Sequence, residues 1–137
     1  MYFSSDVANP DTYTKFYTDI QMYTTNPGRP DPGQWLQAFL STEVAQKANK
    51  WQGRNIVRWQ NAEYDKLWNA SEAEMDPVKR AQMLIELNDM PVKDVAIIPE
   101  LFRQSVAAAT KSLHFPPLTG WDNDTSDIAN WYKDTMA

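Results

Sequence analysis

The residues that could perform catalysis are few in this chain. It contains no cysteine and a single histidine, His114, among 137 residues. Thiolate nucleophiles, disulfides and cysteine-ligated zinc are therefore excluded, and a Ser-His-Asp triad would have to use that one imidazole. Because His114 stands between Leu113 and Phe115, we interpret it as a structural residue. The sequence predicts a protein that is not an enzyme and that uses no cofactor and no metal.

The acidic residues give one motif to test. The run Asp122–Asp127 imitates the opening of a calcium-binding loop. Its sixth position is Asp127, where the loop requires glycine, and its twelfth is Lys133, where a bidentate Glu belongs. We therefore interpret the run as a solvated turn. One alternative stays open, a hydrolase that uses Asp122 and Asp124, which would need both carboxylates in one cleft.

Aromatic residues are unusually frequent, with six Trp and six Tyr. Trp68 falls on the apolar stripe of an expected helix and is predicted to lie in the core. Trp51, Trp59 and Trp121 stand among polar residues in segments without a regular period. Such rings either stack on a ligand or pack loops together, and periodicity does not choose between these two roles.

Composition bounds the class of protein. The length and the hydrophobic content of 42% suit one globular domain. The net charge of −5 argues against a nucleic-acid partner, because phosphate contacts need Lys or Arg. The longest strongly apolar stretch, Val95–Ile98, is far shorter than the roughly 20 residues that span a bilayer. No basic and then apolar leader follows Met1, so we expect a soluble chain that, as given, carries no targeting segment.

Helices are predicted from capping residues and apolar periodicity. Asn61 is expected to cap a helix over 62–75, and Asp76-Pro77 to open a second helix over 77–89. Pro91 should end or kink that second helix, since proline inside a helix costs about 3 kcal/mol. A further helix is expected over 33–49.

Strands are predicted where short, branched and aromatic runs lack the helical period. We expect strands over 17–24 and 95–102, the second interrupted by Pro99. The proline- and glycine-rich stretch 26–33 and the segment 4–14 are expected to be loops, and 51–60 to be irregular. The fold class is thus α/β, with helices packed on a mixed sheet.

Several segments, taken together and in order, resemble one protein family. The helix opening Asp76–Arg80 and the runs Asp94–Arg103 and Val106–Ala108 look like the C-terminal region of the peptide-type solute-binding proteins of ABC transporters. These are the family 5 extracellular binding proteins, which include dipeptide- and oligopeptide-binding receptors. Other stretches similar to that family are Asp19–Thr24 leading to Pro30–Pro32, Asn61–Leu67, Thr119–Asp124 and Ile128–Tyr132.

The resemblance implies a fold and a function. Members of the family are several times longer, so residues 1–137 would be a single C-terminal fragment of a two-lobed protein, part of a periplasmic-binding-protein type II lobe. The implied function is capture of a small solute, a peptide in most members, and its delivery to a membrane permease. The implied location is the periplasm, or the cell exterior on a membrane tether. The implied partners are the ligand, the permease and the missing N-terminal lobe, and uncovered lobe surfaces would favour self-association.

The resemblance also points to ligand-binding residues. The loop after the strand that matches Ile20–Thr24 borders the ligand in the oligopeptide branch, where an Asp binds the amino terminus of the peptide. The candidates here are Tyr23, Thr24, Thr25 and Asn26, with Trp121 as a further aromatic contact. The stretch 26–30 contains no acid, which departs from the family pattern. A surface loop without ligand remains the alternative for these residues, as does a stand-alone aromatic module that binds protein or carbohydrate.

Overall fold

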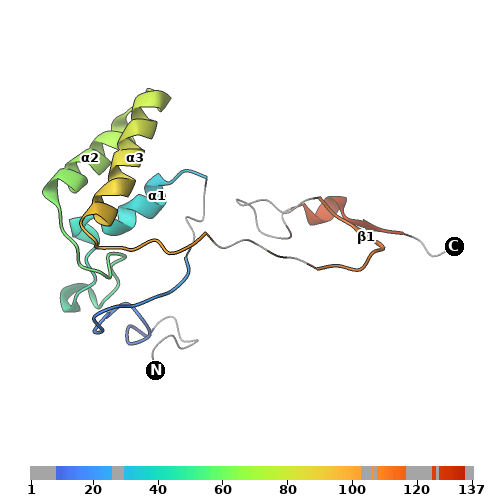
Figure 1. The fold of residues 1–137 in the computed structure, drawn as a ribbon, viewed down its shortest axis with the longest axis horizontal. Coiled ribbons are helices and arrows are strands. Elements are labelled where there is room, and N and C mark those ends of the chain that lie inside the picture. Colours follow the sequence, from blue (N-terminus) through green and yellow to red (C-terminus); the bar gives the residue numbers. More distant parts are fainter. Residues whose placement is uncertain are drawn as a thin grey trace. The chain divides into compact units, whose positions relative to one another are not determined.

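The chain forms two compact units, Met1–Pro99 and Glu100–Ala137, which we call the first and the second unit. The computed structural model describes residues 9–25, 30–102, 106, 108–116, 125 and 127–134. The first unit contains the helices α1 (Gly33–Leu36), α2 (Ala62–Ala73) and α3 (Pro77–Lys93) (Figure 1). The second unit contains the strands β1 (Leu113–His114) and β2 (Tyr132–Lys133). Single turns of 3-10 helix lie at Gln37–Phe39, Ser41–Glu43, Lys47–Asn49 and Ile128–Asn130.

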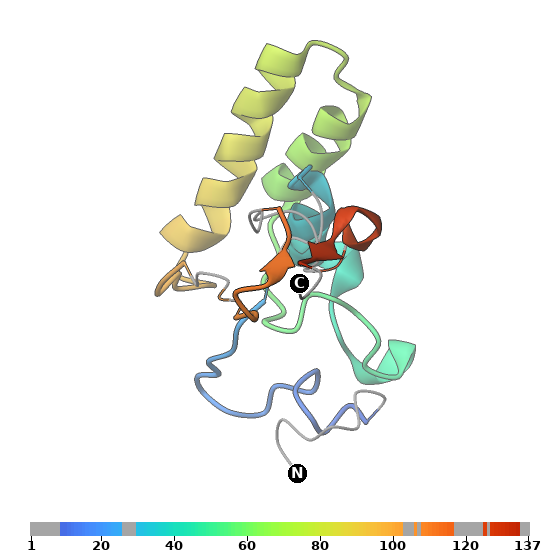
Figure 2. The same cartoon turned by 90° about the vertical axis from the view of Figure 1, so that its right-hand side faces the viewer.

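The two long helices begin at the predicted caps. The Asn61 side chain accepts hydrogen bonds from the backbone N–H groups of Glu63 and Tyr64, at 2.9 and 3.2 Å. Asp76 does the same for Val78 and Lys79, at 2.9 and 3.3 Å. Figure 2 shows the resulting α2–α3 hairpin with α1 packed beside it. Both predicted helices are confirmed, with α2 ending slightly earlier and α3 slightly later than expected.

Of the two outcomes expected at Pro91, an end of the helix is wrong, because α3 includes Pro91 and continues to Lys93. The proline lies in the last turn, where its missing N–H removes only one helical hydrogen bond. Its side chain is fully buried. Its carbonyl is also used, since it accepts from the N–H groups of Ala96 and Ile97 at 2.9 and 3.3 Å. Burial of the side chain and these two hydrogen bonds offset the free-energy cost of a proline inside the helix.

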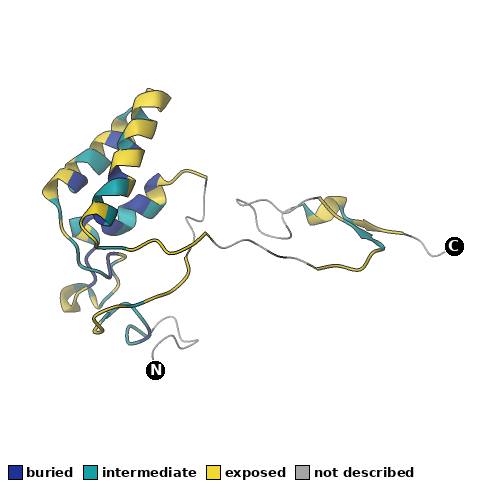
Figure 3. Cartoon of the chain, in the orientation of Figure 1, coloured by how far each residue is buried: buried dark blue, intermediate teal, exposed yellow. Residues whose placement is uncertain are grey.

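The core of the first unit lies between the helices. Its buried apolar members are Leu36, Phe39, Leu40, Tyr64, Leu84 and Leu87, with Trp35, Trp59, Leu67, Trp68, Met90 and Ile97 packed around them. Figure 3 shows the buried positions on the facing sides of α2 and α3. The Tyr64 hydroxyl donates to the carbonyl oxygen of Leu36 at 2.6 Å, and burial raises the pKa of that hydroxyl. The predicted core position of Trp68 is confirmed.

The expected helix over 33–49 is wrong beyond Leu36, because α1 has only four residues and short 3-10 turns follow it. Tertiary hydrogen bonds replace the helical ones in this stretch. The buried Asn55 amide donates to the carbonyls of Phe39 and Leu40, at 3.2 and 3.0 Å. The Asp65 carboxylate accepts from the Ser41 N–H at 2.9 Å. Leu40 is consequently extended, with φ −60° and ψ 144°, so the helix cannot continue.

The strands expected over 17–24 and 95–102 are also wrong. Both segments are irregular, and their apolar side chains are largely exposed, as for Ile20 at 82% and Phe102 at 92%. A strand needs a neighbour for its backbone groups, and neither segment has one among the described residues. The helices pack on one another rather than on a mixed sheet. The sheet that the described residues form is the antiparallel pair β1–β2. The chain therefore contains both helices and strands, as predicted, but its described helices do not pack on a mixed sheet.

An ion pair links Asp31, just before the start of α1, to Arg80 on α3 of the hairpin. The Arg80 guanidinium lies 2.8 Å from Asp31 Oδ2 and 3.3 Å from Glu72 Oε1. Asp31 also accepts from the Gly33 N–H at 2.8 Å, which places this carboxylate at the start of α1. The hydrogen bond from Arg80, then that from Gly33, lowers the pKa of Asp31 against an opposing effect of burial. In the part of the chain that the structure describes, no helix has both the length and the apolar character needed to cross a membrane.

Candidate functional site

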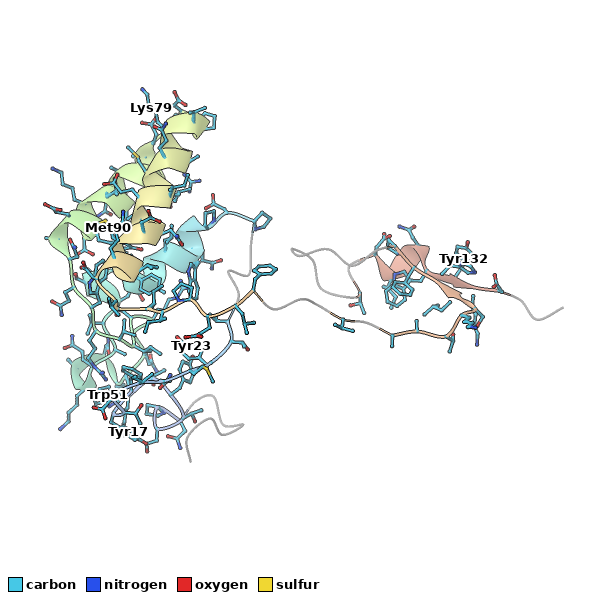
Figure 4. The ribbon with its side chains drawn as sticks, viewed as in Figure 1. Tyr17, Tyr23, Trp51, Lys79, Met90 and Tyr132 are labelled. Carbon is cyan, nitrogen blue, oxygen red and sulfur yellow. The ribbon has the colours of Figure 1, made fainter. Side chains whose placement is uncertain are left out.

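A cleft of about 310 Å³ in the first unit is the candidate site. Aromatic rings, two threonine hydroxyls, one amide and one guanidinium line it. The lining residues are Tyr13, Thr14, Tyr23, Thr25, Trp35, Ala38, Trp51, Gln52, Gly53, Arg54 and Ile56. Tyr23 and Trp51 lie on the same side of the helices, which Figure 4 shows. The volume is at the low end of the roughly 300–1,000 Å³ typical of small-molecule sites.

Three parts of the first unit build the walls of this cleft. The segment 13–25 gives the tyrosines and threonines, α1 and the turn after it give Trp35 and Ala38, and the loop 51–56 gives the rest. The Trp35 ring packs edge-on against the buried Phe39 ring, with their centroids 5.7 Å apart. The core therefore fixes one wall of the cleft.

Gly53 allows the loop 51–56 to approach the neighbouring backbone closely. A Cβ atom at this position would lie 2.2 Å from the Glu43 carbonyl oxygen and 2.6 Å from the Ala45 nitrogen. The next anchor is Asn55, whose N–H donates to Glu43 at 2.8 Å and whose carbonyl accepts from Ala45 at 3.1 Å. The Asn55 amide reaches the Trp59 carbonyl at 2.7 Å. These hydrogen bonds attach the loop to Glu43 and Ala45, which precede it in the sequence, and to Trp59, which follows it.

Cations surround the Trp51 ring. The Arg58 guanidinium carbon lies 5.5 Å and the Lys15 ammonium 6.0 Å from its centroid, within the range of cation–π attraction. Arg58 also donates to the carbonyls of Ala45 at 3.0 Å, Phe16 at 3.4 Å and Lys15. Trp51 and Arg58 have positive φ, 65° and 56°, which non-glycine residues rarely adopt. Arg58 therefore joins the segment 13–25 to the loop that carries Trp51.

The rings of the two tyrosines that line the cleft lie beside each other. The ring centroids of Tyr13 and Tyr23 are 6.2 Å apart, with planes tilted by 45°. Burial, and then the proximity of Tyr13, raise the pKa of the Tyr23 hydroxyl. At neutral pH this hydroxyl is therefore protonated and can donate or accept a hydrogen bond, while its ring offers a face for stacking.

The structure brings two of the predicted ligand contacts into this cleft, Tyr23 and Thr25. Thr24 is exposed and does not line it. Asn26 and Trp121 lie outside the described residues, as do Asp122 and Asp124 of the hydrolase alternative. Sequence reasoning missed Tyr13, Thr14, Trp35, Ala38, Gln52, Gly53, Arg54 and Ile56. A glycine directly after Trp51-Gln52 was the available signal, since it marks a close backbone approach beside an aromatic ring.

Of the two roles considered for Trp51 and Trp59, stacking on a ligand and packing of loops, each residue fits a different one. Trp51 lines the cleft. Trp59 packs instead, because its indole N–H donates to Asp94 at 3.0 Å and its ring meets the buried Tyr64 ring edge-on at 5.1 Å. Trp59 thus packs against the core, and of this pair only Trp51 lines the cleft.

The second unit holds the one histidine. His114 Nε2 lies 2.9 Å from Asp134 Oδ1, and its ring stacks on Tyr132 at 4.5 Å with planes 10° apart. His114 and Tyr132 are direct cross-strand partners in the β1–β2 pair, so stacking supports the pairing. These contacts agree with the structural role predicted for His114.

No group of three or more His, Asp or Glu side chains that could hold a metal ion is found within the described ranges. Comparison with known proteins gives no relative: no protein-family model, no curated protein and no solved structure matches this chain.

Proposed function

We propose that this chain is part of the solute-binding component of an ABC transporter, and that the cleft belongs to the site that captures a small peptide. The observation that carries the proposal is that Tyr23 and Thr25, which the family resemblance selects as ligand contacts, line a cleft with the aromatic rings of Tyr13, Trp35 and Trp51. A site of this kind holds a solute between apolar faces and orients it with a few polar groups.

The chemistry of the cleft suits a peptide. Its rings can stack against an apolar or aromatic side chain, and the threonine hydroxyls and the Gln52 amide can bond to peptide N–H and C=O groups. The volume of about 310 Å³ suits a solute of dipeptide size. In the proposed assembly this chain is the C-terminal part of a two-lobed, periplasmic-binding-protein type II receptor. A second lobe would close over the solute, and a permease would receive it.

The proposal is tested by the thermal unfolding of the chain in the presence of solutes. A ligand that binds only the folded state stabilises it by RT ln(1 + [L]/Kd), about 2.7 kcal/mol at one hundred times Kd. We expect di- and tripeptides at millimolar concentration to raise the unfolding midpoint, measured by circular dichroism. Absence of a shift with peptides, sugars and opines alike would overturn the proposal, and a shift with sugars alone would favour the carbohydrate-binding module.

A matched pair of variants locates the binding. Tyr23→Ala removes a ring that lines the cleft, whereas Tyr17→Ala removes a ring on the same segment that does not line it. The Tyr23 side chain is 46% exposed and that of Tyr17 63% exposed, so neither change creates a cavity in the core. The peptide-dependent shift should be lost in the first variant and kept in the second. Equal shifts in both would mean that the peptide binds elsewhere.

A further inference from the structure

The geometry of the cleft points to the charge of its solute: we infer that Arg54 receives a carboxylate, so that the cleft holds the carboxyl end of a peptide rather than its amino end. The inference rests on the proposed function and adds a ligand class and an orientation to it.

Among the described residues that line the cleft, Arg54 is the charged one. Its Nη1 donates to the Gln37 side-chain oxygen at 3.2 Å, and within the described part of the chain this is its one side-chain hydrogen bond. Other cations are already paired, such as Arg80 with Asp31 and Lys93 with Asp89. The rest of the Arg54 guanidinium is therefore available, and its planar fork matches the two oxygens of a carboxylate.

The surroundings of the cleft add positive charge. The Arg58 guanidinium carbon lies 5.5 Å from the centroid of the Trp51 ring, and its described hydrogen bonds go to backbone carbonyls, which do not cancel its charge. Lys15, also near Trp51, is paired with Asp11. One guanidinium group without an acidic partner among the described residues, that of Arg54, thus lines the cleft, and a second, that of Arg58, lies against the Trp51 ring, in a chain of net charge −5. Such a local reversal of sign attracts an anionic group.

No acidic residue is among the described residues that line the cleft. The stretch 26–30, next to Thr25 in the sequence, also contains neither Asp nor Glu. A peptide ammonium would then meet a guanidinium without a compensating carboxylate, which costs free energy by like-charge repulsion. A carboxylate in the same place gains a charge-assisted hydrogen bond. The wall therefore discriminates between the two ends of a peptide.

The test uses four probes on the complete 137-residue chain. They are the dipeptide Ala-Phe, its C-terminal amide, its N-acetyl derivative and the derivative with both ends blocked, each titrated by the change in tryptophan fluorescence. Hydrogen bonds to charged groups contribute about 1.5–3 kcal/mol, so amidation should weaken binding about tenfold or more. N-acetylation should change the dissociation constant by less than about threefold, because the inference gives the ammonium no partner.

Variants assign the effect to one side chain. In Arg54→Gln the acid and the amide should bind equally, because the guanidinium that separates them is gone. Lys79→Gln is the control, since Lys79 lies on α3 far from Tyr23 and Trp51 (Figure 4) and its loss also lowers the net charge by one unit. Arg54 is exposed, so folding should persist, and far-UV circular dichroism checks this. The comparison of acid with amide in the unchanged chain needs no variant.

The outcomes separate this inference from the proposed function. If acid and amide bind equally to the unchanged chain, or if acetylation is the change that weakens binding, the carboxylate inference is overturned while peptide capture stands. If none of the four probes binds, and no other peptide shifts the thermal transition, both are overturned. A discrimination that survives in Arg54→Gln, or one that Lys79→Gln abolishes as completely as Arg54→Gln does, also overturns the assignment to Arg54.

Discussion

Gly53 is a cleft residue at which one added methyl group would clash with the backbone. In Gly53→Ala the new Cβ would lie 2.2 Å from the Glu43 carbonyl oxygen and 2.6 Å from the Ala45 nitrogen. Both are backbone atoms, which cannot turn aside as a flexible side chain can. Overpacking of this kind costs about 1–3 kcal/mol, so we expect the free energy of unfolding in urea to fall by that amount and the fluorescence of Trp51 to change.

Gly33→Ala is the matched control for this prediction. Its Cβ would meet the ends of flexible side chains, Asp31 at 3.0 Å and Glu72 at 3.1 Å, and alanine is the better helix former by about 0.5–1 kcal/mol. We expect the free energy of unfolding to change by less than about 1 kcal/mol. If both variants lose equal stability, close approach of the loop is not the reason for glycine at position 53.

At the residue scale, local chemistry was predictable and tertiary partners were not. The caps Asn61 and Asp76 were predicted because each acts on backbone N–H groups two or three residues away. Tyr23 was identified through family resemblance rather than through its own pattern. The separate roles of Trp51 and Trp59 depend on Lys15 and Arg58 for the first and on Asp94 for the second, partners that sequence spacing does not indicate.

At the scale of elements, the start of α1 should make stability depend on acidity. The pKa of Asp31 is lowered in the folded chain by the hydrogen bonds from Arg80 and from the Gly33 N–H. A carboxyl group of this kind stabilises the fold above its unfolded pKa of about 3.9, and this contribution is lost as the pH falls through the lowered value. We expect urea unfolding of Asp31→Asn to show a weaker loss of stability than the unchanged chain as the pH falls below about 4.

The size of that effect is limited by exposure. The Asp31 side chain is about half exposed, so the pair should contribute no more than about 1 kcal/mol at neutral pH. Asp89→Asn is the control for the loss of an ion pair as such, because it breaks an exposed pair with Lys93 within α3. A profile of Asp31→Asn that matches the unchanged chain would contradict the role given to Arg80.

Helices and strands differed in how far the sequence could predict them. The helices α2 and α3 carry their own caps, hydrogen bonds and apolar faces, so their existence follows from local residues. The segments 17–24 and 95–102 have strand-like composition, yet a strand exists only beside another strand. The helix predicted over 33–49 does not continue past Leu36 for a related reason. The side chains of Asn55 and Asp65, distant in the sequence, form hydrogen bonds with backbone groups of this stretch.

At the scale of the whole molecule, the core belongs to one unit. The buried members of the core cluster lie between Leu36 and Leu87, and Ile97 is the last side chain in the described ranges that packs against that cluster. The second unit has strands of two residues each, supported by the His114–Tyr132 stack and the Phe115–Trp131 contact at 5.5 Å. A two-stranded pair of this size is at best marginally stable alone.

A chain that ends at Pro99 should therefore fold by itself. It keeps the whole core cluster, both long helices and every residue that lines the cleft. We expect cooperative urea unfolding by far-UV circular dichroism, with a single transition, and the same response to Ala-Phe as the full chain. The complementary peptide Glu100–Ala137 should show no cooperative transition, because none of its described residues belongs to the core. A gradual, non-cooperative loss of helix in the shortened chain would mean that the second unit supplies contacts without which the first unit does not fold.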